Sequence, residues 1–382
     1  MRRKTRRVLC GGVPIGGGAP VTIQSMTNTD TRDAAATLSQ IRELEEAGCE
    51  IVRVSVPDHE AAEAFKEIRK GTELPLVADI HFDYRLAVEA IRAGADKVRI
   101  NPGNIGGRER VRAVIDAAKE RRIPVRIGVN SGSIEKDILA SFGGPTAEGL
   151  VESALRNAAL VEEMGFEDIV LSVKSSDVIM NYRAYLQLSD RSDYPLHIGV
   201  TESGTPSTGI IKSSVGLGAL LLAGVGDTMR VSLTADPVKE IPVAREILKN
   251  TGHFDGGIDF VSCPTCSRCK TDLTAIADGI MSQLGGIENQ MLKKRMPKIK
   301  VAVMGCAVNG PGEASDADFG VACGEKKGVF FRNGEIVDTV REEQITERIV
   351  SEVRRFTERF PPEVQAGREG GKSDEYRTVR HR

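Results

Sequence analysis

The sequence predicts an α/β fold in which a (β/α)8 barrel of the TIM type is followed by a smaller α+β domain. From Val21 to about Lys249, short β-branched runs alternate with amphipathic segments of helical length, which is typical of parallel β/α units. Eight such units fit within this stretch, and closed barrels usually take ~250 residues. The alternation then stops at a polar, glycine-rich segment, residues 251–257. A doubly wound open sheet is the alternative, and the count of eight argues against it.

The barrel elements follow from the hydrophobic pattern. Amphipathic helices are expected after each strand, as in the spacing of Leu38, Ile41 and Leu44. The last helix has a start signal, because Asp236 is suited to an N-cap and Pro237 to the first helical position. The predicted strands are residues 21–26, 50–56, 74–80, 96–101, 123–129, 167–173, 194–200 and 227–233.

The segment 251–257 is interpreted as a linker between a barrel over residues 1–250 and a second domain over residues 258–360. The second domain is predicted to contain strands at 258–262 and 298–305, a helix at 272–284, a hairpin that turns at Asn333-Gly334, and a helix at 342–356. Residues 361–382 lack periodicity and are expected to form a disordered tail.

Composition excludes several classes of protein. The 382 residues carry a formal charge of -2 and 40% are hydrophobic, so a large core is expected and no general attraction to nucleic acid. The basic N-terminus leads into glycines and not into the apolar core of a signal peptide, and the longest apolar run, GALLLAGVG, is too short to span a bilayer. Seven cysteines then indicate a reducing cytoplasm, in which clustered thiols serve metal or redox chemistry.

Cations recur near the carboxyl ends of five predicted strands. A buried strand seldom carries an arginine, yet the matched positions are Arg53, Arg99, Arg126, Lys174 and Arg230. In a β/α barrel these strand ends line the mouth where active sites are built, so the five side chains are expected to converge on a polyanionic ligand such as a diphosphate. The alternative is that each arginine pairs with an inward-facing acid.

Few acids are available for such pairing. The evident ones at strand ends are Asp79 and Glu202, and both are placed to donate protons or to orient other groups, with His81 nearby. Asp79 alternatively only orients an arginine. The backbone of Asn101 to Asn104, which leads into the next helix, offers amide donors for phosphate. Asn130 and Ser232 are polar strand-end residues of the same kind.

A cysteine cluster marks the second domain. Cys263, Cys266 and Cys269 follow a strand at two-residue spacing, and Cys306 follows another strand of the same domain. The spacing permits a tetrahedral zinc site, with Cys323 or Cys269 completing the set, and it equally permits an iron–sulfur cluster.

Glu313 favours an iron–sulfur cluster over zinc at this site. It lies seven residues after Cys306, beyond a Gly-Pro-Gly turn that could return its carboxylate to a metal. An oxygen ligand on one iron is exchangeable and would open a Lewis-acid position. The alternative is a turn with a solvated glutamate.

Taken together, these motifs resemble a known family. QSMTNTDT, VRVSVPD, PLVADIHFDYRLA, VRINPGNIG, RIGVNSGS, DTMRVSLTADP, SCPTCSR and CAVNGPGEA occur in this order between Val21 and Phe356. In order and spacing they are similar to the 4-hydroxy-3-methylbut-2-en-1-yl diphosphate synthases of the non-mevalonate (MEP) isoprenoid pathway, in their short, two-domain bacterial form.

The resemblance implies an iron–sulfur oxidoreductase. Such enzymes join a TIM barrel to a domain like those of sulfite and nitrite reductases and carry a 4Fe-4S cluster. They convert 2-C-methyl-D-erythritol 2,4-cyclodiphosphate to hydroxymethylbutenyl diphosphate by ring opening and loss of a hydroxyl, with two electrons from flavodoxin or ferredoxin. The family also implies a homodimer in which the cluster domain of one subunit closes over the partner's barrel.

Residue roles carry over by motif. The resemblance implies that Cys263, Cys266, Cys306 and Glu313 bind the cluster. It implies that the five barrel cations hold the cyclic diphosphate, with hydrogen bonds from Asn101, Asn130 and Ser232. Protonation falls to Asp79, His81 or Glu202, with Glu202 preferred.

One position departs from the family pattern. The family does not usually place a cysteine where Cys269 stands, and we expect this thiol to have no role. Two other functions compete with the reductase. One is a phosphate-binding barrel whose second domain is held by structural zinc, and the other is an electron carrier whose barrel is only a scaffold.

Overall fold

The computed structural model describes residues 2–294, 296–306, 312 and 314–359. The chain divides into two compact units, Met1–Phe254 and Asp255–Arg382. The division falls inside the segment 251–257 that the sequence indicates as a linker. The predicted tail at 361–382 lies outside the described residues.

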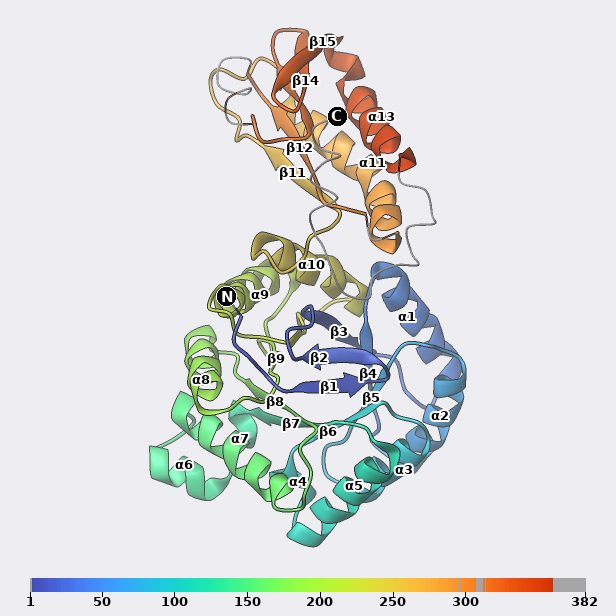
Figure 1. Ribbon diagram of the computed structural model, residues 1–382, viewed down its shortest axis with the longest axis vertical. Coiled ribbons are helices and arrows are strands. Elements are labelled where there is room, and N and C mark those ends of the chain that lie inside the picture. The colour runs from blue at the N-terminus through green and yellow to red at the C-terminus, as the bar shows by residue number, and fades with distance from the viewer. Residues whose placement is uncertain (1, 295, 307–311, 313, 360–382) are drawn as a thin grey trace. The chain divides into compact units, whose positions relative to one another are not determined.

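The first unit is an eight-stranded parallel barrel (Figure 1). Its strands follow the order β8-β7-β6-β5-β4-β3-β10-β9, and a parallel bridge between Leu171 and Leu196 closes the circle. The predicted fold class is confirmed, although β9 and β10 are much shorter than their hydrophobic runs. The strands are β3 (Thr22–Met26), β4 (Ile51–Ser55), β5 (Leu76–Asp79), β6 (Lys97–Ile100), β7 (Val125–Asn130), β8 (Ile169–Lys174), β9 (His197–Ile198) and β10 (Thr228–Met229).

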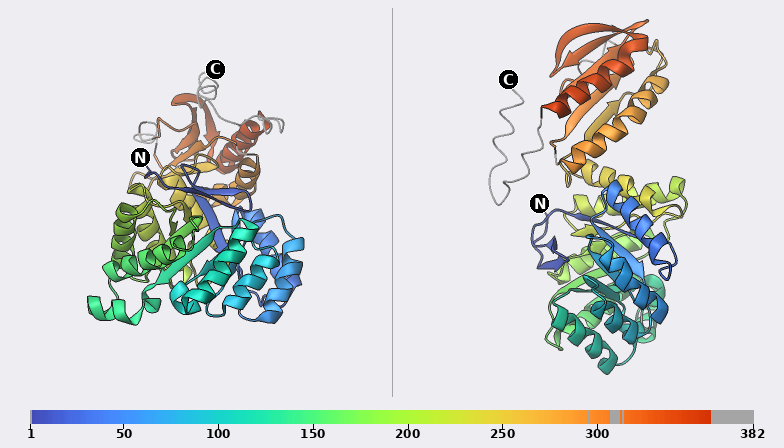
Figure 2. Two further views of the ribbon diagram at one scale, coloured as in Figure 1. Left: turned by 60° about the horizontal axis from the view of Figure 1, so that its bottom comes forward. Right: turned by 90° about the vertical axis from the view of Figure 1, so that its right-hand side faces the viewer.

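Helices surround the strands (Figure 2) and bury the main core against their outer faces. Asp236 acts as a cap, as predicted, since its Oδ1 accepts from the Val238 amide at 3.0 Å, but the turn that it caps is 3-10. The helices are α1 (Ala34–Ala47), α2 (His59–Lys70), α3 (Tyr84–Arg92), α4 (Pro102–Ile105), α5 (Arg108–Arg121), α6 (Lys136–Phe142), α7 (Ala147–Glu162), α8 (Val178–Arg191), α9 (Pro206–Leu222) and α10 (Glu240–Asn250), with 3-10 turns η1 (Ser131–Ser133) and η2 (Pro237–Lys239).

An N-terminal hairpin that the sequence did not predict covers one end of the barrel. It consists of β1 (Arg7–Cys10) and β2 (Val13–Gly16), joined through Gly11 and Gly12, whose φ angles of 52° and 90° favour glycine. Its buried side chains meet residues from the starts of three barrel strands, so the hairpin seals the amino-terminal end. The cluster comprises Val8, Cys10, Ile15, Ile51, Val77 and Val170.

The second unit is a five-stranded mixed sheet with helices packed on one face. β11, β12 and β13 run parallel, and β14 and β15 are antiparallel. The predicted turn is confirmed at Asn333 and Gly334, with φ of 49° and 78°. The predicted helix at 272–284 continues to residue 293. The elements are β11 (Ile258–Ser262), α11 (Leu273–Lys293), β12 (Ile299–Met304), β13 (Phe319–Cys323), β14 (Lys327–Arg332), β15 (Glu335–Arg341), η3 (Glu342–Gln344) and α13 (Ile345–Glu358).

The helices of the described residues bear on membrane insertion. None is both long and apolar enough to cross a bilayer.

The role of the hairpin as a seal is testable. Ile15 is fully buried, whereas Leu9 on the same hairpin is 52% exposed. Ile15→Ala should lower the free energy of unfolding by about 2–5 kcal/mol because it leaves a cavity under the barrel. Leu9→Ala, the control, should change it by less than about 1 kcal/mol. Urea unfolding followed by circular dichroism measures both, and equal effects would show that the hairpin is not packed as a seal.

Candidate active site

Five cations converge inside the barrel, as the sequence predicts. Ile51 and Val170 line the sealed end, and since side chains alternate along a strand, Arg53 and Lys174 also point inward. Arg99, Arg126 and Arg230 join them from β6, β7 and the end of β10. Lys174 interacts electrostatically with all four arginines, which places the five groups in one site.

Asp79 is the carboxylate at the centre of this cluster. Its Oδ1 lies 3.3 Å from Arg99 Nη1, and its Oδ2 lies 3.8 Å from Arg53 Nε and 3.4 Å from His81 Nε2. Burial by itself would raise the pKa of this carboxyl, but Arg53, His81 and Arg99 outweigh burial and hold the pKa well below its usual range. Asp79 is therefore ionised, which suits a group that orients cations better than a proton donor.

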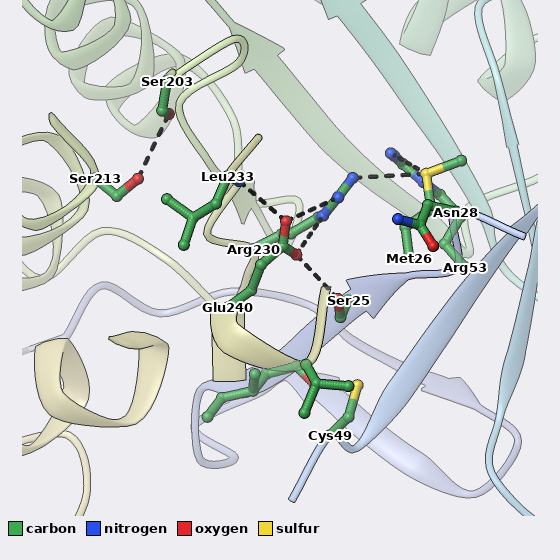
Figure 3. A network of polar contacts seen from close by, with 12 residues as sticks. Ser25, Met26, Asn28, Cys49, Arg53, Ser203, Ser213, Arg230, Leu233 and Glu240 are labelled. Atoms are coloured by element: carbon green, nitrogen blue, oxygen red, sulfur yellow. Dashed lines mark hydrogen bonds and ion pairs between the residues drawn. The ribbon is translucent and has the colours of Figure 1, made fainter. Parts of the chain in front are cut away.

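Glu240, which the sequence analysis did not identify, is the second buried carboxylate (Figure 3). Its two oxygens accept from Arg230 Nε at 3.1 Å and Nη2 at 3.2 Å. Ser25 Oγ and the Leu233 amide donate to the same carboxylate at 2.9 and 3.1 Å. Glu240 thus ties the end of β10 to the first strand of the barrel and fixes the Arg230 guanidinium.

The Met26 sulfur supports two of the arginines from a neighbouring strand (Figure 3). Arg53 Nε and Nη2 donate to its Sδ at 3.0 and 2.9 Å, and Arg230 Nη1 lies 3.5 Å away. A thioether is a weak acceptor without charge, so it positions these groups without neutralising them.

Arg126 and Lys174 have no ion-pair partner within the part of the chain that the structure describes. Arg126 is only 1% exposed, and its Nε and Nη1 make no hydrogen bond there. Glycines make room for two of the cations, since a Cβ on Gly128 would stand 2.7 Å from Arg99 Nε and one on Gly199 2.6 Å from Lys174 Nζ. The pairing alternative raised by the sequence thus applies to Arg53, Arg99 and Arg230, but not to these two.

The predicted amide and hydroxyl groups lie around this site, but one is already engaged. Asn101 is buried, where its Oδ1 accepts from the Gly103 amide at 3.1 Å and its Nδ2 donates to Ser133 Oγ at 3.2 Å. It therefore shapes the loop after β6. Asn130 and Ser232 are partly exposed.

Glu202 and His81 stand at the exposed rim. Glu202 has a φ of 52°, an unusual conformation for a glutamate and one that often marks a functional loop. The His81 side chain is 51% exposed and reaches the edge of the cation cluster through Asp79. Both can meet a ligand at the mouth.

In the second unit, parallel strands bring the cysteines to one edge of the sheet. Cys263 follows β11 and Cys306 follows β12, and Cys263 Sγ accepts from the Gly305 amide at 3.1 Å. Cys266 is exposed, and the Arg268 backbone amide, followed by its side chain, lowers the pKa of that thiol. An amide bonded to sulfur and a thiol with a lowered pKa are both features of metal-binding cysteines.

The donor chemistry therefore fits a thiolate-ligated metal or cluster. No three His, Cys, Asp or Glu side chains of residues 2–294, 296–306, 312 and 314–359 already form a set that could hold a metal ion. Glu313, the proposed oxygen ligand, lies outside these residues. Cys269 Sγ would stand 2.9 Å from a Cβ on Gly305, so this additional thiol lies beside the same edge.

Comparison with known families covers both units. The family model described as GcpE TIM-barrel domain matches residues 5–245, and the one described as GcpE protein C-terminal domain matches residues 259–355. Curated relatives named 4-hydroxy-3-methylbut-2-en-1-yl diphosphate synthase (flavodoxin) include those of Ruminiclostridium cellulolyticum, Geobacillus kaustophilus and Thermodesulfovibrio yellowstonii. The first is 54% identical to this chain over an alignment that covers 92% of the chain and 98% of the relative. For the second, the identity is 55% and the alignment covers 94% of each protein. For the third, the identity is 52% and the alignment covers 93% of the chain and 99% of the relative.

Asp79 provides a stability test with a defined pH dependence. Asp79→Asn leaves Arg53 and Arg99 without their counter-charge, so the free energy of unfolding at pH 7 should fall by about 3 kcal/mol. A depressed carboxyl pKa stabilises the fold above the unfolded value of about 3.9 and loses this effect as the pH falls further. The difference between the two proteins should therefore be constant near neutrality and shrink below about pH 4.

Urea titrations from pH 7 to pH 3 measure this difference. Asp137→Asn is the matched control, because Asp137 forms an exposed ion pair with Arg156 at 2.6 Å. The control should change stability by less than about 1 kcal/mol. A neutral effect of Asp79→Asn at pH 7 would contradict the central position given to Asp79.

Proposed function

The chain belongs to the GcpE family, and on that premise we propose that it converts 2-C-methyl-D-erythritol 2,4-cyclodiphosphate to 4-hydroxy-3-methylbut-2-en-1-yl diphosphate. The reaction is a reductive ring opening with loss of a hydroxyl and belongs to the non-mevalonate isoprenoid pathway. The product is the one in the names of the relatives. The observation that carries the proposal for this chain is the convergence of five cations on one end of the barrel, two of them without a carboxylate partner among the described residues.

The cations bind and orient the two phosphoryl groups. Arg53, Arg99 and Arg230 are held by Asp79 and Glu240 and present fixed guanidinium groups at the mouth. Lys174, which is 7% exposed, contacts the ligand from the barrel interior. Arg126 is fully buried and strengthens the positive electrostatic potential on that side of the ligand. Asn130 and Ser232 add hydrogen bonds, and Asn101 acts through the loop that it holds.

Loss of a hydroxyl as water requires a proton. Asp79 is a poor source because its pKa is depressed, so it orients the arginines and His81. Glu202 is the preferred donor, since it stands exposed at the rim on a strained backbone, and His81 is the alternative.

The family is one of 4Fe-4S enzymes, and in this chain Cys263, Cys266, Cys306 and Glu313 would hold the cluster. When bound, the cluster supplies the two electrons for cleavage of the carbon–oxygen bond. The chain's own part is to offer the thiolates at one sheet edge, with the Gly305 amide bonded to Cys263.

Electron supply and assembly follow the family. The names of the relatives specify flavodoxin, and ferredoxin is the other candidate donor. A homodimer is proposed in which one subunit's cluster domain closes over the partner's barrel and the segment 251–257 acts as the hinge. The clustered thiols suit the reducing cytoplasm as its location.

Turnover tests the proposed reaction directly. Protein purified without oxygen, supplied with reduced flavodoxin and the cyclic diphosphate, should release hydroxymethylbutenyl diphosphate. Its metal content should be about four irons and four sulfides per chain. One zinc with no iron, persisting after reconstitution, would instead support the zinc-stabilised phosphate-binding barrel. A cluster without turnover would support the electron carrier.

A pair of neighbouring thiols tests the ligand assignment. Cys266→Ser should lose most of the iron, sulfide and visible absorbance, because serine is a poor substitute for thiolate at iron. Cys269→Ser, three residues along the same loop, should retain them. If Cys269→Ser loses the cluster and Cys266→Ser keeps it, the ligand set must be redrawn. Far-ultraviolet circular dichroism checks that both variants fold.

A further inference from the structure

Below the cation cluster, the barrel interior holds polar side chains where branched apolar side chains are usual. Gln24, Lys97 and His197 are each at most 1% exposed. Their polar atoms Gln24 Nε2 and Oε1, Lys97 Nζ and His197 Nε2 have no hydrogen-bond partner among the described residues. Buried polar groups normally have partners, so polar side chains at these positions indicate a role other than packing.

The charged groups that face this interior are nearly all cations. His197 faces Arg126, Lys174, Lys97 and Arg53, and the Thr228 hydroxyl lies 3.4 Å from its Nδ1. Lys97 faces Arg126 and Arg53 and, from the hairpin, the neutral thiol of Cys10. The strand β3 contributes only uncharged groups, Thr22, Gln24 and Met26.

Two carboxylates face the same space, and both are already engaged. Asp79 serves Arg53, Arg99 and His81, and Glu240 serves Arg230 and Ser25. Neither forms an ion pair with Lys174, Lys97 or Arg126 within the described part of the chain. The interior therefore carries more positive charge than its acids offset.

Burial among uncompensated cations disfavours the charged form of a titratable side chain. Burial, with the arginines around it, lowers the pKa of Lys174 well below its usual range, and burial, with Arg126, does the same to the pKa of His197. Burial lowers the pKa of Lys97 to about 8, so it stays mostly charged at neutral pH. Arginines keep their charge and Lys97 is already mostly protonated, so Lys174 and His197 are the groups whose protonation a ligand can change most.

We propose that the barrel takes up protons when a diphosphate binds at its mouth, and that Lys174 and His197 accept them. Each phosphoryl group of the ligand brings a negative charge that offsets the arginines and favours the charged forms of both side chains. The proposal rests on the proposed function, because it takes the cyclic diphosphate as the ligand. Protons bound in this way stand beside a substrate whose hydroxyl must leave as water.

Calorimetry of the unsubstituted protein tests the uptake. The cyclic diphosphate is titrated into the full chain with its cluster, without reductant, in PIPES, HEPES and Tris at pH 7.5. Each phosphoryl group of this ligand keeps one fully ionised oxygen, so the ligand itself exchanges no proton at this pH. Plotted against the buffer's ionisation enthalpy, the heat should rise with a slope of about one proton per chain.

The pH dependence of the affinity gives a second reading. Because protons are taken up on binding, the affinity should fall as the pH rises, by about tenfold per pH unit for each proton. A slope of zero in the first experiment with an unchanged affinity in the second would overturn the proton uptake while leaving the proposed function standing. No binding of the cyclic diphosphate in any buffer would overturn both.

Two substitutions test the assignment. Lys174→Arg keeps a cation that cannot lose its proton, so the number of protons taken up per bound ligand should fall, whatever the change in affinity. His197→Gln keeps a polar side chain without a titrating group and should also reduce the slope. Lys212→Met, on the exposed face of α9, is the control and should leave the slope unchanged. If neither interior variant lowers the slope although both bind the ligand, the assignment to Lys174 and His197 is wrong.

Discussion

Uncompensated positive charge inside the barrel is the constraint on which the rest of this structure depends. A buried cation loses its hydration, and only a nearby carboxylate or a ligand can replace it. Asp79 and Glu240 provide the fixed part of that compensation and reach Arg53, Arg99 and Arg230. The positive charge that they leave unmatched, at Arg126 above all, gives the barrel its attraction for a dianion and makes the protonation of Lys174 and His197 depend on the ligand.

Much of this arrangement is readable from the sequence, and the reason is geometric. A basic side chain within a β-branched run must point inward or outward from a strand, and the recurrence of four arginines and a lysine near the ends of five strands indicates a common destination. The sequence does not show how deep each of these side chains lies along the barrel axis. Arg126 looks equivalent to Arg230 in the sequence, yet Arg126 is fully buried and Arg230 reaches the mouth, because depth depends on the stagger between strands and on the seal below.

Long-range partners were the features that the sequence did not reveal. Glu240 lies on a helix after the last strand, where a glutamate ordinarily faces solvent, and only the closed barrel brings it to Ser25 and Arg230. The hairpin at residues 7–16 was missed because its strands are short and glycine-rich, and its burial depends on barrel residues far along the chain. The glycines at 128 and 199 did leave a signal, since each follows a buried basic side chain by two residues and so lies on the same inner face.

The seal and the charge depend on each other. Water that entered at the amino-terminal end would screen the cations and weaken their hold on a ligand at the other end, because the attraction between charges grows as the surroundings become less polar. Val8 and Ile15 close that end against Val77 and Val170, so the mouth is the open route for an anion to reach the cluster. Because the closed end keeps water from these cations, the free barrel is less stable than a barrel with an apolar interior would be. A ligand that binds only the folded form raises the stability again as its occupancy increases. Buried cations therefore lower the stability of the barrel without ligand and raise its affinity for an anionic ligand. This explains why the interior departs from the apolar packing usual for the fold.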